Sequence, residues 1–317
     1  MLASVLWPGP LSLVGKAQHF VPMEVSAGTG YVAVRCPDHP VALKFLEACR
    51  VPVAGPSANK FGHISPSCPA HVRKNFPAAS YDVAVLDGGP CGVGIESSVV
   101  EIREERNVVN VRLLRRGFVT VDVLTRTLSK FHDVKVGLSE KQQHLDSQIL
   151  GADVETVELL QPYEEKRRAA ENYDVSVSPG TALTHYSPTL PMFLVSLSAN
   201  EFSEHPVVSL FGRPLHPHEV VLIDFRSQLS SLSDDVGAYL NLSGDSANEV
   251  SSQCFRLLHE AEDLGTSTTG VKCIVAVQLT NHFFDKEEIL AVYDRIFRAA
   301  SGKRCHVYGE GESAKFC

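Results

Sequence analysis

The sequence predicts an α/β protein of two domains joined by a long linker. Its 317 residues are too many for one ordinary domain and too few for three. Short β-branched runs alternate with helical apolar periods, which is typical of strands covered by helices. Around residues 131–190 this periodicity stops, and charged and turn-forming residues dominate. We therefore expect domains at 1–130 and 191–317, with the linker between them.

The first domain is predicted to contain six strands and two helices. Apolar residues at helical spacing predict a helix at 39–50, and a closing helix is expected at 119–128. β-branched runs bounded by Gly, Pro or Asp predict the strands. These strands are expected at 11–14, 31–35, 51–54, 83–87, 97–103 and 109–115.

The second domain is predicted to hold a parallel sheet. Uninterrupted apolar runs indicate buried strands, and two long amphipathic periods indicate helices. Strands that alternate with helices favour a parallel sheet covered on both faces. The expected strands are 191–196, 220–224 and 273–278, and the expected helices are 247–261 and 286–300.

The charge distribution argues against a general nucleic-acid binder. The net charge is −8, and residues 123–317 carry 17 basic against 27 acidic side chains, whereas residues 1–122 carry 12 against 10. A nucleic-acid binder is expected to be basic overall. The nearly neutral first part can still hold a local anion site.

The apolar runs and the cysteines of the sequence indicate in which cellular compartment the protein is expected. No run approaches the roughly 20 apolar residues that span a bilayer, so we expect a soluble protein with no membrane partner. The apolar segment 1–14 resembles a signal peptide but has no basic residue before Lys16. Eight scattered cysteines without a CxxC pair argue against a zinc site and favour a reducing compartment, the cytoplasm. The pair of His216 and His218 is not expected to bind a metal.

Two segments of the first domain are candidates for anion binding. Arg35 ends a predicted strand, and its planar guanidinium suits a carboxylate or a phosphate. The loop GPSAN at 55–59 offers hydroxyl, amide and backbone donors that can surround an anion. A solvated surface arginine and a purely structural turn are the alternatives.

A glycine cluster and three arginines extend this pattern. The run GGPCGVG at 88–94 lacks the context of a dinucleotide fingerprint or a phosphate-binding P-loop, so a flexible hairpin is an equal alternative. Of Arg112, Arg115 and Arg116, one can reach a triphosphate while the others are solvated. GxSxG and HExxH motifs are absent, so positioning and charge stabilisation fit better than a covalent nucleophile. From these patterns alone the protein is a nucleotide- or anion-binding α/β protein.

Several motifs, taken in order, resemble a known family. The chain is similar to the long, two-domain form of the YrdC/Sua-type threonylcarbamoyl-AMP synthases. The resemblance implies a YrdC-like domain with a twisted mixed sheet, a linker that closes over the active site, and a smaller Rossmann-like α/β domain. The motifs are WPGPL (7–11), VAVRCPDHP (32–40), GPSANKFGHISPS (55–67), GIESSVVEI (94–102), LLRRGFVT (113–120), and SPG (178–180) followed by HYSP (185–188).

The resemblance implies a tRNA-modification enzyme. L-threonine, bicarbonate and ATP would give threonylcarbamoyl-AMP and pyrophosphate, with Mg²⁺ on the ATP phosphates and no dedicated metal ligands. A tRNA threonylcarbamoyl-transferase complex would then pass the activated group to an adenosine, giving N6-threonylcarbamoyladenosine. Contact with tRNA or double-stranded RNA is compatible with this role, as are a cytoplasmic location and an additional mitochondrial pool.

The resemblance also assigns residues of this sequence. Threonine would bind at Arg35, Gly55 and Ser97. ATP would contact Tyr31, Ser57, Ser65, Arg115 and Tyr186, although the family commonly has a small hydroxyl residue where Tyr31 lies. Ser57 and Asn59 would be the catalytic pair.

One departure from the family concerns the N-terminus. A Lys-x-Arg element is expected upstream of the WPGP turn and does not occur here. We therefore expect a chain truncated at its N-terminus, with early strands missing and apolar surfaces uncovered. The alternative is a short, non-catalytic YrdC-like protein that binds nucleotide or RNA. Carbamoyl transfer in metalloenzyme maturation is disfavoured because the expected cysteine-rich zinc pattern does not occur.

Overall fold

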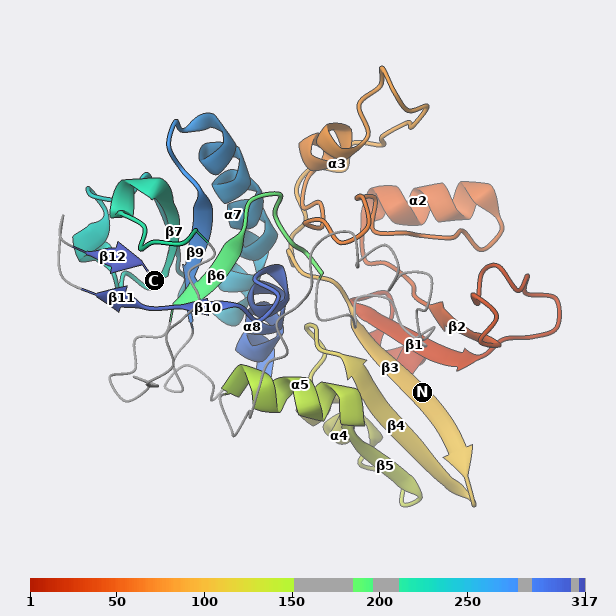
Figure 1. Ribbon diagram of the computed structural model, residues 1–317. Coiled ribbons are helices and arrows are strands. Elements are labelled where there is room, and N and C mark those ends of the chain that lie inside the picture. Colours follow the sequence, from red (N-terminus) through yellow and green to blue (C-terminus); the bar gives the residue numbers. More distant parts are fainter. Residues whose placement is uncertain (151–184, 196–210, 279–286, 309–313, 317) are drawn as a thin grey trace. The chain divides into compact units, whose positions relative to one another are not determined.

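Two five-stranded sheets organise the chain (Figure 1). The computed structural model describes residues 1–150, 185–195, 211–278, 287–308 and 314–316. Two compact units are formed, the first by residues 1–56 and 96–182 and the second by residues 57–95 and 183–317. The predicted α/β class is confirmed. Residues 57–95, which the sequence assigned to the first domain, pack with the second unit.

The sheet of the first unit is mixed, in the order β2-β1-β3-β4-β5. β1 is antiparallel to β2 and parallel to β3, whereas β4 is antiparallel to β3 and parallel to β5. Four of the six strands predicted for this domain are confirmed. The bounds are β1 Leu11–Lys16, β2 Tyr31–Val34, β3 Ser98–Glu105, β4 Val108–Arg115 and β5 Val134–Leu138.

The register of this sheet gathers four strand termini at one end. Leu13 pairs with Val34, so β1 begins where β2 ends. Leu11 also pairs with Ser98, which places the start of β3 at the same end. Val99 pairs with Arg115, the last residue of β4. Residues just outside these termini therefore lie close together although they are far apart in the sequence.

Helices α4 (Val121–Leu128) and α1 (Leu2–Leu6) complete the core of the first unit. The side chain of Thr120 caps α4 by accepting from the Val123 amide. Residues 134–150, assigned to the linker from sequence, form β5 and helix α5 (Glu140–Leu150) instead. The alternating apolar residues of β5 pack against the core, which explains this strand. The rest of the predicted linker, up to residue 184, lies outside the described residues.

Two strand predictions in the central part of the sequence are wrong. The segments 51–54 and 83–87 are β-branched but form no strand, and the side chains of Val51, Val53, Val83 and Leu86 are exposed. A strand needs a neighbouring strand to satisfy its backbone groups, and within the described ranges neither segment has one. Helix α2 (Pro40–Cys49) was predicted correctly, yet none of its residues is buried.

The sheet of the second unit is entirely parallel, in the order β10-β6-β9-β7-β8. Numbered along this unit the order is 5-1-4-2-3, which differs from the 3-2-1-4-5 order of the dinucleotide-binding fold. The parallel sheet is confirmed, but the Rossmann-like detail is not. The bounds are β6 Met192–Val195, β7 Val220–Phe225, β8 Ala238–Leu242, β9 Cys273–Val277 and β10 Arg304–Cys305.

Helix α7 (Ala247–Ser267) is the main helix of this unit and packs against β7, β8 and β9. It extends six residues beyond the predicted end at 261 and also packs against α8 (Glu287–Ala299). The shorter elements are α3 Pro69–Asn75, the 3₁₀ turns Pro217–Glu219 and Ser230–Leu232, and the strands β11 Val307–Tyr308 and β12 Lys315–Phe316. None of the helices in the described residues is long and apolar enough to cross a membrane. The seven described cysteines form no disulfide with one another.

The core of the first unit gives a stability prediction. Leu113 of β4 is 0% exposed, and we expect Leu113→Ala to lower the free energy of unfolding of this unit by about 2–5 kcal/mol because it leaves a cavity. The single tryptophan, Trp7, packs against the same core, so its fluorescence in a urea titration reports this transition. The matched control is Leu86→Ala in the second unit, where the side chain is 64% exposed. Equal midpoints for the two variants would contradict the assigned core.

Candidate functional site

A buried polar cluster lies at the end of the first sheet where the four strand termini meet. It comprises Ser12, Ser97 and Arg115, all buried. The hydroxyls of Ser12 and Ser97 are 2.8 Å apart. The Arg115 guanidinium donates to the Ser97 carbonyl from Nε at 3.2 Å and from Nη2 at 3.0 Å, and Nη2 lies 3.3 Å from the Ser97 hydroxyl. The structure thus brings together two predicted site residues, Ser97 and Arg115. It adds Ser12, whose position in a strand gave no chemical signal.

Arg35 lies at the same end of the sheet, directly after β2. Its Nε donates to the Gly9 carbonyl at 3.1 Å, and the Gly9 amide donates to the Cys36 carbonyl at 2.9 Å. These bonds tie the WPGP turn to the start of the loop after β2. A Cβ at Gly9 would collide with the Leu6 carbonyl, so glycine is required there. The side chain of Arg35 is exposed, but the hydrogen bond from its Nε keeps it beside the strand termini.

Two other predicted residues of this unit are not joined to the cluster. Tyr31 begins β2 and pairs with Lys16, so it lies at the opposite end of the sheet, about 13 Å along the strand from Arg35. The Arg103 guanidinium lies 5.1 Å from the centre of its ring. Gly55 is exposed, and a Cβ there would meet nothing within 4 Å. The roles of Tyr31 and Gly55 stay predictions.

The three arginines of β4 and the turn after it have separate environments. Arg112 is exposed, and Arg115 belongs to the polar cluster. Arg116 is buried and forms two-pronged contacts with Asp146 of α5, at 2.7 Å from Nη2 and 3.2 Å from Nε. The expectation that the remaining arginines are solvated is therefore wrong for Arg116. Its partner lies in a helix that the sequence did not predict.

In the second unit, the loop after Pro56 holds Asn59 in a defined conformation. Its amide nitrogen donates to the carbonyls of Lys60 and His63 at 2.9 and 3.0 Å. Its amide oxygen is buried and has no hydrogen-bond partner among the described residues. Ser57 is exposed at the start of the loop. Because a buried acceptor is normally paired, Asn59 has an unused capacity to accept a hydrogen bond or to meet a cation.

The described end of the linker returns to this loop. The Ser187 amide donates to the Gly62 carbonyl at 2.8 Å. Tyr186 is fully buried, and its ring centre lies 5.1 Å from that of Phe255 and 5.8 Å from the Arg295 guanidinium. The predicted Tyr186 and the predicted loop are therefore connected in one unit. The SPG motif and residues 181–184 lie outside the described residues.

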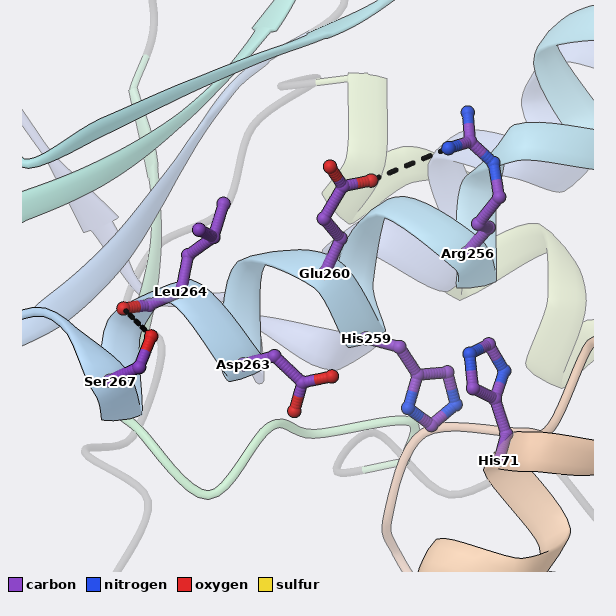
Figure 2. A pocket seen from close by; sticks show the side chains of 7 residues that line it. All are labelled: His71, Arg256, His259, Glu260, Asp263, Leu264 and Ser267. Carbon is purple, nitrogen blue, oxygen red and sulfur yellow. Dashed lines mark hydrogen bonds and ion pairs between the residues drawn. The ribbon is translucent and has the colours of Figure 1, made fainter.

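Two stacked histidines lie beside the same loop (Figure 2). The rings of His71 from α3 and His259 from α7 are 3.7 Å apart and inclined by 26°. Burial, the neighbouring His259 and Lys74 together lower the pKa of His71 to about 4. Burial also lowers the pKa of His259, although its bond to the Ser65 carbonyl opposes this. Both imidazoles are consequently neutral at physiological pH, and sequence reasoning did not single out either residue.

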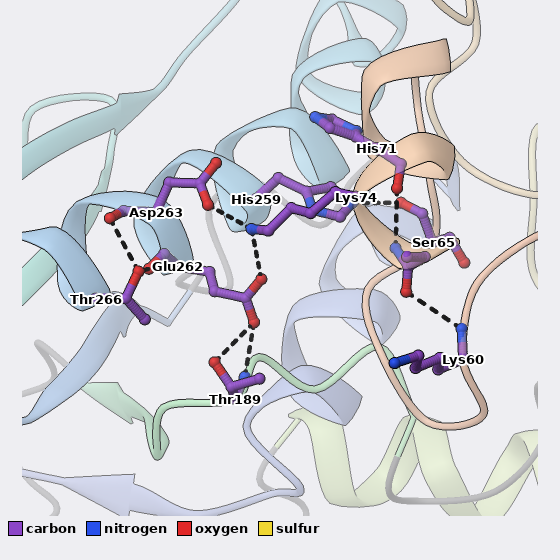
Figure 3. A network of polar contacts seen from close by, with 10 residues as sticks. Lys60, Ser65, His71, Lys74, Thr189, His259, Glu262, Asp263 and Thr266 are labelled. Atoms are coloured by element: carbon purple, nitrogen blue, oxygen red, sulfur yellow. Dashed lines mark hydrogen bonds and ion pairs between the residues drawn. The ribbon is translucent and has the colours of Figure 1, made fainter. Parts of the chain in front are cut away.

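An ion network continues from the histidines along α7 (Figure 3). Lys74 of α3 contacts Asp263 and lies 3.1 Å from Glu262. Burial opposes the charge on Lys74, but these carboxylates outweigh it and raise its pKa. Burial likewise opposes the charge on Glu262, but the Thr189 amide and Lys74 outweigh it and lower the pKa.

An open pocket of about 410 Å³ lies next to the two rings (Figure 2). Across its wall Arg256 pairs with Glu260 at 3.4 Å. Asp263, which also lines the pocket, pairs with Lys74. The charges around this pocket are therefore satisfied by one another.

Two family models match the two parts of this chain. A Sua5/YciO/YrdC model described as "Telomere recombination" matches residues 1–117, and a model described as "Threonylcarbamoyl-AMP synthase, C-terminal domain" matches residues 148–301. The chain belongs to the Sua5 family. The resemblance seen in the sequence motifs is thus confirmed over both parts of the chain.

Sua5 relatives extend beyond this chain. The threonylcarbamoyl-AMP synthase of Pyrococcus abyssi is 27% identical over 304 residues, which are 96% of this chain and 74% of that protein. The Bacillus subtilis threonylcarbamoyl-AMP synthase is 31% identical over 59% of this chain and 43% of its own length. The chain therefore spans less than half of the B. subtilis relative.

Solved Sua5 structures share the two-sheet architecture. A crystal structure of P. abyssi Sua5 complexed with L-threonine has a TM-score of 0.66 and 25% identity, covering 97% of this chain and 75% of that one. A second structure is a P. abyssi Sua5 variant in which an adjacent histidine and tyrosine are replaced by alanine, with a TM-score of 0.65. The predicted two-domain Sua5 fold is thus confirmed.

The histidine pair predicts a pH dependence of stability. The pKa of His71 is about 4 in the folded chain against 6.5 for the free side chain, so unfolded chains bind the proton first. The free energy of unfolding therefore keeps its full value above pH 6.5 and decreases as the pH falls towards 4. The lowered pKa of Glu262 changes the free energy of unfolding only below its ordinary value of 4.5. Between pH 6.5 and 4.5 the pH dependence of stability therefore comes mainly from the histidines.

We expect His71→Gln to reduce the loss of stability between pH 7.0 and 5.0, measured by urea unfolding with circular dichroism. His144→Gln, in α5 of the first unit, is the matched control and should keep the wild-type pH dependence. An unchanged pH dependence in His71→Gln would contradict the assigned pKa shift.

Proposed function

We propose that this chain is a threonylcarbamoyl-AMP synthase, a nucleotidyltransferase acting on L-threonine, bicarbonate and ATP. The observation that carries the proposal is the end of the first sheet, where Arg35 lies beside the buried cluster of Ser12, Ser97 and Arg115. A cationic fork next to hydroxyl groups suits a hydroxylated amino acid with a free carboxylate. The similar P. abyssi Sua5 structure is a complex with L-threonine, which supports the same substrate here.

In this proposal the first unit binds threonine. Arg35 holds the carboxylate, and Ser97 lines the pocket in a position maintained by Arg115. Gly55 leaves space for close approach of the ligand, because nothing lies within 4 Å of the position of a Cβ. Binding thus relies on groups whose positions are set before the ligand arrives.

Of the predicted ATP contacts, Arg115 belongs to the first unit, and the loop and linker end belong to the second unit. Ser57 and Asn59 contribute hydroxyl and amide groups to the reacting phosphate, and Ser65 and Tyr186 contact the nucleotide. The unused amide oxygen of Asn59 supports a ligand at this loop.

The chemistry of the proposed reaction is carbamate formation followed by adenylyl transfer. The threonine amine attacks the carbon of bicarbonate, and a water molecule leaves to give a carbamate. A carbamate oxygen then attacks the α-phosphorus of ATP in line, and the bond to the bridging oxygen of pyrophosphate breaks. The guanidinium and hydroxyl groups offset charge on the phosphate during this step.

Magnesium fits this proposal as an ion carried by the ATP phosphates. No group of three or more His, Cys, Asp or Glu side chains within the described ranges is placed to hold a metal. Mg²⁺ prefers oxygen ligands, and commonly keeps water and substrate phosphates among them. The amide oxygen of Asn59 is a suitable protein contact, and the bound ion would reduce the negative charge of the triphosphate.

The product would be consumed by a tRNA threonylcarbamoyl-transferase complex. Threonylcarbamoyl-AMP is a mixed anhydride, so its carbonyl group is activated for attack by an amine such as that of adenosine. The carbamoyl carbon bonds to this nitrogen, and AMP leaves.

Two arginine substitutions separate the proposed substrate contacts. We expect Arg35→Ala to raise the KM for threonine about 10- to 100-fold, because a charge-assisted contact is lost. Arg115→Ala should mainly raise the KM for ATP. Arg112→Ala removes an exposed arginine of the same strand and should leave both KM values near wild type.

Pyrophosphate release by the wild-type chain is the readout, and it should require threonine, bicarbonate and ATP together. Turnover that continues without threonine would contradict the synthase, as would binding of both ligands without turnover. If Arg115→Ala raised only the KM for threonine, its role would be support of Ser97 rather than contact with ATP.

Metal removal gives an independent prediction. EDTA should abolish pyrophosphate release, and excess Mg²⁺ should restore it, because the phosphates require a cation. Threonine binding measured by calorimetry should not change on EDTA addition. Turnover that persists in EDTA would contradict the proposed role of Mg²⁺.

A further inference from the structure

The two stacked histidines bond to both ends of the three-residue segment 65–67 in the predicted nucleotide loop. His259 Nε2 lies 3.1 Å from the Ser65 carbonyl oxygen. Two residues later, the Ser67 amide lies 3.2 Å from His71 Nδ1. The segment 65–67 is thus bonded at each end by an imidazole, and the two imidazoles also stack on each other. The Cys91 amide donates to the Ser67 carbonyl at 2.8 Å and also fixes this segment.

These contacts define the tautomers of both rings. A carbonyl oxygen only accepts hydrogen bonds, so His259 must carry its proton on Nε2. A backbone amide only donates, so His71 must be unprotonated at Nδ1. Each ring therefore has a directional role that substitution by another aromatic side chain cannot reproduce.

The next turn of α7 binds two further segments through one carboxylate. Glu262 accepts from Lys74 of α3 at 3.1 Å, and also from the amide and hydroxyl of Thr189 at 2.8 and 3.0 Å (Figure 3). Thr189 lies three residues after Tyr186. His259 and Glu262 are three positions apart, so they project from one side of α7.

Packing of α7 against the sheet would not require His259 and Glu262 to bond to segments outside the helix. The buried His259 and Glu262 side chains and the partly exposed ring of His71 bond to backbone groups of the loop and of the linker end. These are the two segments of this unit that carry predicted ATP contacts. Both segments are thereby attached to adjacent turns of a single rigid helix.

We propose that His259 and Glu262 of α7, with His71, are positioning residues. They hold the segment 65–67 of the predicted nucleotide loop and the linker end at Tyr186 in the arrangement that ATP requires. This inference rests on the proposed function. It assigns a role to α7, in the C-terminal family domain, that does not require contact with either substrate.

The test compares substitutions that retain different parts of the His259 contact. His259→Phe keeps an aromatic ring for stacking but has no donor for the Ser65 carbonyl. His259→Gln keeps an N–H near the position of Nε2. Calorimetry on the full chain with Mg²⁺ then gives the Kd for ATP and, separately, the Kd for threonine.

We expect His259→Phe to weaken ATP binding about three- to tenfold and to change the threonine Kd by less than twofold. His259→Gln should restore much of the ATP affinity. Glu262→Gln should also weaken ATP binding selectively. Glu260→Gln is the matched control and should not, because Glu260 lies on the same helix but pairs with Arg256 of that helix at 3.4 Å.

Unchanged ATP affinity in both His259→Phe and Glu262→Gln would overturn the inference and leave the proposed function intact. Equal losses for ATP and threonine, together with a lower Tm, would show a purely structural role and would also overturn it. If His259→Phe does not fold, the comparison of Glu262→Gln with Glu260→Gln decides. A wild-type chain that binds no ATP would overturn both the inference and the proposed function.

Discussion

The contact between Arg115 and the Ser97 carbonyl is the interaction on which the polar end of the first unit depends. The guanidinium makes two hydrogen bonds to one carbonyl and a third to the hydroxyl of the same residue. A buried carbonyl needs a donor, and a buried guanidinium needs acceptors. Removal of the guanidinium would leave the buried Ser97 carbonyl without these two donors. Ser12 and Arg35 are arranged around this contact by the strand register.

Backbone packing beside this contact is equally constrained. A Cβ at Gly117 would overlap the backbone of Ser97 and Ser98. The turn after β4 can therefore approach the start of β3 only because residue 117 is glycine. The Ser98 hydroxyl uses this proximity, since it donates to the Val119 carbonyl at 2.7 Å and accepts from the Val119 amide at 2.9 Å. The motifs GIESS and RRGFV thus form one structural element although they are separated in the sequence.

In the second unit, α7 buries two hydrogen-bonded polar side chains in addition to its apolar ones. His259 and Glu262 are buried, and a buried polar group is costly unless it is hydrogen-bonded. Here the bonds go to Ser65, Lys74 and Thr189, all outside the helix. The desolvation cost is offset by bonds that determine where other segments lie. This gives the C-terminal part of the chain a physical connection to the loop that carries Ser57 and Asn59.

Local sequence patterns determined most of the elements and the identity of the family. Strands β1, β3, β4, β7 and β9 followed from β-branched runs, because their side chains are buried on the sheet. The amphipathic period likewise predicted α2, and the ordered motifs indicated a two-domain Sua5 protein. Each of these signals is contained within a short segment or in the order of segments.

Tertiary structure alone decided which residues meet. The segments 51–54 and 83–87 have the composition of strands, but a strand exists only when another strand pairs with it. Arg116 is buried because α5 supplies Asp146, and His71 and His259 are 188 positions apart before folding stacks their rings. Such contacts depend on register and on the packing of distant segments, and a single sequence encodes them only through the complete fold.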